Sequence, residues 1–139
     1  MTRILIAALA GAWAVGTLAA QDTFKTRLSP TPIDAQLAPT VTGHGSISAV
    51  LTGAKLTISG TFEDMRSAAT AAHLYQSKVI GVPGVAIHDL TVSKAMAGTV
   101  SGSVDLTTPQ ADALRKGLLY VVVHSEGAPD GNLRGWLLK

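Results

Sequence analysis

Two segments of the chain alternate strictly between apolar and polar side chains. Residues 54–62 and residues 98–106 both show this period of two, which places every apolar side chain on one face of an extended strand. Such strands need a partner layer that covers the apolar face, so the chain must fold around a β-sheet. The apolar positions of the two segments are Leu56, Ile58, Phe62, Val100, Val104 and Leu106.

Further strands are indicated on both sides of these two. Residues 118–124 are apolar on both faces, which is typical of a central strand. Asp130 and Gly131 form a turn signal before the apolar residues 132–138, and this combination predicts a hairpin. Weaker strand patterns cover residues 45–51, 71–76 and 85–92.

A single helix is predicted before the C-terminal hairpin. Thr108 is a suitable N-cap, Pro109 suits the first helical position, and Gly117 suits the position just past the end. About seven short strands separated by glycine and proline turns, together with one short helix, predict an all-β antiparallel sandwich or barrel.

The N-terminus has the pattern of an export signal. Arg3 precedes residues 4–20, which carry no charge and end in small side chains, so residues 1–20 are predicted to be a secretory signal peptide. An uncleaved membrane anchor is the alternative. Residues 21–40 contain three prolines and are expected to form an extended segment or a first edge strand, leaving 41–139 as the domain. A periplasmic or secreted protein with no membrane span after cleavage is expected.

Composition excludes several function classes. The formal net charge is +2 and only 14% of the residues are charged, so there is no basic surface for nucleic acid. The chain has no cysteine, which excludes disulfides, thiolate zinc sites and cysteine nucleophiles. It also lacks a nucleophile elbow and a phosphate-binding loop in the required context. A protein without catalytic activity is therefore expected.

Three stretches resemble the CHRD family, whose domain is named after chordin. They are residues 72–75 (Ala-His-Leu-Tyr) with the glycine-rich loop that follows, residues 106–114, and residues 117–135. The resemblance covers about residues 41–138 and implies an immunoglobulin-like β-sandwich in a secreted protein. Tyr75, Val122 and Asn132 depart from the family pattern. The residues that match its signature are His73, Tyr120, His124, Gly131, Arg134 and Gly135.

The four histidines allow a metal-binding interpretation. His73 and His124, with His44 or His88 as a third ligand, would suit copper or zinc if their ring nitrogens lie within about 4 Å of each other. A second resemblance, to copper–zinc superoxide dismutase, is distant. Because Tyr75 interrupts the His-x-His pair of that enzyme, its activity is not expected here.

A structural role is the alternative for the same residues. His124 could be held by a backbone group, by Asn132 or by Arg134, and Arg134 could stack on Trp136 or pair with an acidic neighbour. Tyr75 and Trp136 are candidate contacts for a partner. The sequence thus predicts a non-catalytic binding or structural module, with no cofactor required. Its partner, a protein or a cell-envelope component, would meet an edge strand or the loops 75–84 and 126–131.

Overall fold

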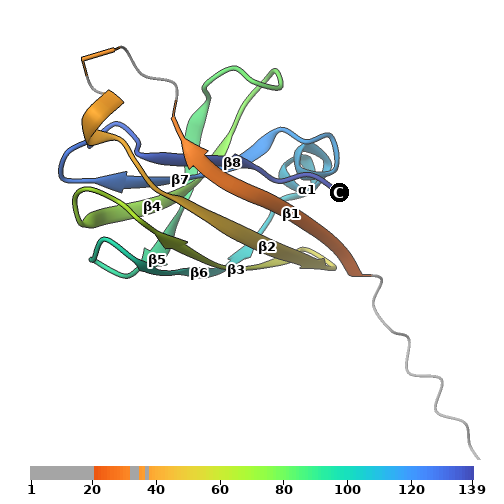
Figure 1. Cartoon of the computed structure of the whole chain (residues 1–139). Helices are drawn as coiled ribbons and strands as arrows, with labels where there is room; N and C mark the ends of the chain where they lie inside the picture. Colours follow the sequence, from red (N-terminus) through yellow and green to blue (C-terminus); the bar gives the residue numbers. More distant parts are fainter. Residues whose placement is uncertain (1–20, 32–34, 37) are drawn as a thin grey trace, which may run out of the picture.

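The computed structural model describes residues 21–31, 35–36 and 38–139; the predicted signal peptide lies outside this part of the chain. Its strands form a closed antiparallel barrel in the order β1-β2-β3-β6-β5-β4-β7-β8 (Figure 1). The elements in chain order are β1 (Gln21–Pro30), a 3-10 turn (Ala38–Thr40), β2 (His44–Thr52), β3 (Lys55–Glu63), β4 (Ala69–Gln76), β5 (Val85–Val92), β6 (Gly98–Asp105), α1 (Thr108–Arg115), β7 (Leu119–Ser125) and β8 (Leu133–Trp136).

The predicted number of strands is too low by one, and the sheet is closed as a barrel. The difference arises at β1, for which the sequence left open an extended segment or an edge strand. This strand pairs with β2 from Gln21 to Leu28 and with β8 through Ser29 and Pro30, so it has a neighbouring strand on each side. Pro30, which cannot donate a ladder hydrogen bond, occupies the end of the strand, where proline is tolerated.

The alternating strands pack as their pattern predicts. Leu56 of β3 lies opposite Val104 of β6, and both side chains are buried in the barrel core. All seven residues of β7 are buried, because loops cover the outer face of this strand while the core covers its inner face. The prediction of a central strand with two apolar faces is therefore confirmed.

Two glycines lie where a side chain would collide with the neighbouring strand of the β2–β3 pair. A Cβ atom added to Gly60 would collide with the carbonyl oxygen of Ser46, and one added to Gly45 would collide with that of Thr61. Glycine at such positions permits the close backbone approach and sharp bending that barrel closure requires.

The helix begins one residue earlier than predicted. Its N-cap is Thr107, whose Oγ1 accepts a hydrogen bond from the Gln110 backbone at 3.3 Å, while the Gln110 side chain accepts one from the Thr107 backbone at 3.0 Å. The reciprocal pair is a capping box, and it makes the preceding threonine a better cap than Thr108. Gly117 follows the helix with φ 75°, as predicted for the position past its end. With eight residues α1 is far too short to cross a bilayer, and the described residues contain no longer helix.

The capping box gives a direct stability prediction. Thr107→Ala removes an acceptor for an N-terminal amide of α1 and should lower the free energy of unfolding by about 1 kcal/mol. Thr108→Ala is the matched control and should change it by less than about 0.5 kcal/mol. Urea denaturation followed by circular dichroism measures both free energies of unfolding. A larger loss for Thr108→Ala would mean that Thr108, as the sequence predicts, is the N-cap.

Candidate functional site

Aromatic rings line up across three strands on the outer face of the barrel. Tyr75 of β4 lies opposite Tyr120 of β7, which lies opposite Trp136 of β8. The two tyrosine rings stack with centroids 5.1 Å apart, and the Tyr120 and Trp136 rings are 4.4 Å apart. These cross-strand contacts form a continuous aromatic ladder and hold the three rings in fixed positions.

A second row lies beside this aromatic ladder. His73 of β4 lies opposite Val122 of β7, which lies opposite Arg134 of β8. The guanidinium carbon of Arg134 lies 6.0 Å from the centre of the Trp136 ring, so the stacking predicted for this pair is present. Among the described residues the guanidinium has no ion-pair or hydrogen-bond partner, so it does not pair with Asp130 or Glu126.

His124 is held by the loop that follows β7. Its Nδ1 lies 2.9 Å from the carbonyl oxygen of Pro129, and since a carbonyl can only accept, Nδ1 carries the hydrogen. Of the alternatives left open by the sequence, the backbone is therefore the partner. Only 8% of the residue is exposed, and this burial lowers the pKa of His124, so its neutral form is favoured.

Two side chains converge on Nε2 of His124. His73 Nδ1 lies 3.0 Å from this atom and the Tyr75 hydroxyl lies 3.2 Å from it. The expected approach of His73 and His124 within about 4 Å is thus present. Burial raises the pKa of Tyr75, so its hydroxyl stays protonated and donates toward His124. On its other side, His73 Nε2 lies 3.2 Å from a carboxylate oxygen of Asp89.

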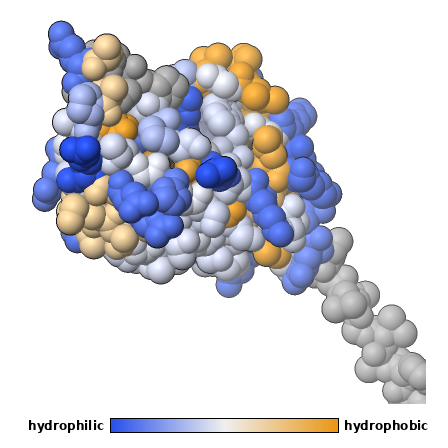
Figure 2. Space-filling view, in the orientation of Figure 1, coloured by the Kyte–Doolittle hydropathy of each residue, from blue (hydrophilic) through white to orange (hydrophobic). Residues whose placement is uncertain are grey.

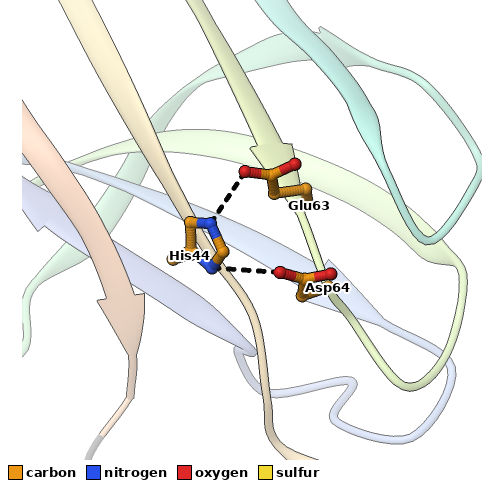
Figure 3. Close-up of side chains that lie close together, drawn as sticks. All are labelled: His44, Glu63 and Asp64. Atoms are coloured by element: carbon orange, nitrogen blue, oxygen red, sulfur yellow. Dashed lines mark hydrogen bonds and ion pairs between the residues drawn. The ribbon is translucent and has the colours of Figure 1, made fainter.

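The structure does not bring all four histidines together. His44 starts β2 and contacts two carboxylates, Glu63 at 2.8 Å and Asp64 at 3.5 Å, in an exposed cluster (Figure 3). Among the described residues, this cluster of His44, Glu63 and Asp64 is the only group of three or more His, Cys, Asp or Glu side chains that lie close enough together to hold a metal ion. His88 lies on β5 opposite Leu74 and is half-buried.

A pocket of about 560 Å³ opens on the outer face beside the aromatic ladder. Tyr75, Tyr120 and Val122 line it from the strands, and two loops form its walls. The first loop is fixed to the ladder, because the amide of Gly84 donates to the Tyr120 hydroxyl at 2.8 Å. The second loop contributes residues 127–131, and Arg134 lines the same pocket.

The β4–β5 loop, which forms the first wall of the pocket, has an apolar tip. Val79, Ile80 and Val82 are each at least half exposed, and they form the hydrophobic surface over the β4–β5 loop at the top of Figure 2. This loop lies within residues 75–84, and residues 127–131 line the opposite wall, so the pocket lies between the two loops in which the sequence placed a partner contact.

Two glycines of the predicted signature have structural roles. Gly131 has φ 143°, a conformation that favours glycine, at the turn before β8. A Cβ atom on Gly135 would lie 2.7 Å from the Thr26 side chain, so this glycine allows β8 to approach β1 closely.

Sequence reasoning missed Asn132 as a buried polar anchor. Its Oδ1 accepts from the Ser125 hydroxyl at 2.8 Å, and its Nδ2 donates to the carbonyl of Thr42 at 2.8 Å. Both Asn132 and Ser125 are fully buried. The signal was a polar residue inside an apolar strand pattern, which predicts a side chain with satisfied hydrogen bonds. For Asp89, which lies next to His73, the sequence contains no such signal.

Comparison with known families decides the assignment. The family model of the CHRD domain matches residues 10–137, which is nearly the whole chain. The chain belongs to the CHRD family. The match begins earlier than the resemblance seen in the sequence and includes β1, so this CHRD domain contains the strand that closes its barrel. CHRD domains are small extracellular-type modules. The searches found no matching curated protein and no matching solved structure.

Proposed function

We propose that this protein is an extracytoplasmic binding module without catalytic activity, and that its ligand occupies the pocket on the outer face of β4, β7 and β8. The family supports the extracytoplasmic location, since CHRD domains are generally extracellular-type modules. The predicted signal peptide supports export to the periplasm or the medium. Determination of the N-terminal residue of the exported protein tests this step, and a retained residue 1 would contradict it.

The observation that carries the binding proposal is the unpaired guanidinium of Arg134. It lines the pocket without an ion pair or hydrogen bond to any described residue. Its stacking on Trp136 leaves the planar N–H groups available, and such a fork suits a carboxylate. The ligand would therefore carry a carboxylate that reaches Arg134.

The rest of the pocket suits a ring or an apolar side chain. Tyr75 and Val122 supply an apolar floor, and its volume falls in the range typical of small-molecule sites. We therefore take the occupant to be a segment of a protein partner in which an aromatic side chain stands next to a carboxylate, such as an aromatic C-terminal residue. Aromatic and arginine side chains are also the residue types that dominate protein interfaces.

Titration of the ¹⁵N-labelled protein with N-acetyl-tyrosine and with its amide tests this chemistry. The free acid should shift the amide signals of Gly84 and Gly131 and bind about tenfold more tightly than the amide, since a charge-assisted contact contributes about 1.5 kcal/mol or more. Arg134→Gln should remove that preference. Lys55→Gln, which removes an exposed cation on β3, is the control and should retain it.

Equal binding of acid and amide, or shifts confined to other parts of the barrel, would contradict the proposal. Turnover of a defined substrate by the purified protein would contradict its non-catalytic part.

A further inference from the structure

We propose that Nδ1 of His73 and Nε2 of His124, with the Tyr75 hydroxyl oxygen as a third ligand, form a binding site for a divalent copper ion. The site lies on the outer face of β4 and β7, at the edge of the pocket to which Tyr75 contributes. This inference goes beyond the carboxylate-binding function and does not depend on it, because it uses neither Arg134 nor a pocket ligand.

The orientation of the two histidine rings carries the argument. Nδ1 of His124 donates to the Pro129 carbonyl, so in the neutral ring its Nε2 carries a lone pair. This lone pair faces Nδ1 of His73 at 3.0 Å. When Nδ1 of His73 carries a hydrogen the contact is a hydrogen bond; when the hydrogen is on Nε2 of His73 instead, both facing nitrogens present lone pairs to which one cation can bind.

Tyr75 adds an oxygen atom beside the two nitrogens. Its hydroxyl lies 3.2 Å from Nε2 of His124, and Nδ1 of His73 lies 3.0 Å from the same atom. A cation placed between the two histidines can therefore take the hydroxyl oxygen as its third ligand.

The surrounding contacts are those of a metal centre. Histidine ligands almost always donate their other ring N–H to a carboxylate or a backbone carbonyl, which fixes the orientation of the ring. Here Nδ1 of His124 donates to a carbonyl, and Nε2 of His73 lies 3.2 Å from a carboxylate oxygen of Asp89. His73 and Tyr75 also project from the same face of β4, two residues apart.

The distance favours copper over zinc. Two nitrogens 3.0 Å apart, each about 2.0–2.1 Å from a shared ion, subtend an angle of about 94° at that ion. This angle is close to the cis angle of about 90° in the tetragonal complexes of Cu²⁺ with nitrogen and oxygen ligands, whereas Zn²⁺ prefers a tetrahedral angle of about 109°. Copper also has the highest affinity among the divalent first-row ions for such a ligand set.

Titration of the untagged, chelator-treated chain with CuCl₂ tests the site by calorimetry, electron paramagnetic resonance and visible absorption. Copper binding would displace the hydroxyl proton of Tyr75 to the solvent. We therefore expect one ion per chain, hyperfine coupling to two nitrogens, a phenolate-to-copper absorption band and weaker binding of ZnCl₂. His73→Gln should reduce the copper affinity at least 100-fold. Tyr75→Phe, which retains the ring stacked on Tyr120, should abolish the absorption band and reduce the affinity about tenfold.

Two controls separate this site from the other histidines. His44→Gln disrupts the exposed cluster with Glu63 and Asp64, and His88→Gln removes the isolated histidine of β5. Both variants should keep the wild-type affinity within about twofold and keep the absorption band. Circular dichroism checks that each variant is folded. If His73→Gln does not fold, the loss of the absorption band in Tyr75→Phe still tests the site independently.

Several results would overturn the inference. They are the absence of stoichiometric copper binding by the wild-type chain, wild-type affinity in His73→Gln, loss of binding in His44→Gln, or tighter binding of zinc than of copper. The first of these would mean that a proton, rather than a metal ion, lies between His73 and His124.

Discussion

Asn132→Asp should lower the free energy of unfolding by about 3–5 kcal/mol at pH 7, because it places an uncompensated charge in the core. The new side chain has almost the same shape as asparagine and keeps the acceptor for the Ser125 hydroxyl. Its second oxygen, however, would face the Thr42 carbonyl, to which Asn132 now donates. A carboxylate cannot donate there, and both it and the carbonyl are acceptors.

This defect should depend on pH in a defined direction. The buried carboxyl would have a raised pKa in the folded state and an ordinary value of about 3.9 in the unfolded chain. The folded state therefore binds the extra proton first as the pH falls, and the protonated oxygen can donate to Thr42. The loss of stability relative to the wild type should be greatest at pH 7 and decrease toward pH 4.

Thermal and urea unfolding of both proteins at pH 7 and pH 4 measures this difference. Ser125→Ala is the control, because it removes a hydrogen-bonded hydroxyl of the same network without introducing a charge. It should cost about 1–3 kcal/mol with no change between the two pH values. A pH-independent loss in Asn132→Asp would show that the side chain is not buried as described.

Gly60→Ala should lower the free energy of unfolding by about 2–3 kcal/mol, the cost of forcing extra volume into a packed site. The added methyl group would collide with a backbone carbonyl of β2, which cannot rotate away as a side chain would. Either the β2–β3 ladder must separate locally or the barrel must change its curvature.

Ser59→Ala is the matched control for this substitution. Ser59 is the preceding residue of β3, it is exposed, and alanine there adds no atom but only removes the hydroxyl oxygen. Its stability should change by less than about 0.5 kcal/mol. Urea denaturation compares the two variants, and equal stability would mean that barrel closure does not depend on the small size of Gly60.

The local elements of the barrel could be predicted because their patterns are local. The period of two in β3 and β6 and the double apolar face of β7 indicated the strands that form the core. Closure of the sheet could not be predicted, since it depends on β8 meeting β1 about 100 residues earlier in the chain. A long-range pairing of two residues leaves no periodic signal in either strand.

The candidate site shows the same division. His73, Tyr75 and His124 were identifiable as residue types, and strand alternation placed His73 and Tyr75 on one face. Which histidines meet depends on strand order, and β4 pairs with β7 while His44 lies on β2 across the barrel. The roles of Asp89 and Asn132 depend on contacts with particular residues of other segments, which no spacing rule encodes.

Closure of the barrel restricts how this protein can recognise another chain. Every strand of the described barrel has a neighbour on both sides, but the β5–β6 ladder contains only Thr91 and Val92 of β5, so residues 85–90 have no ladder partner on that side. Partners that bind by extending a sheet are therefore restricted to the places where a ladder is short, such as this side of β5. Of the two contact modes that the sequence allowed, edge strand or loops, the loops and the outer side chains offer the larger surface. Selectivity then depends on side-chain chemistry, and variation of the loops can change the ligand without altering the barrel.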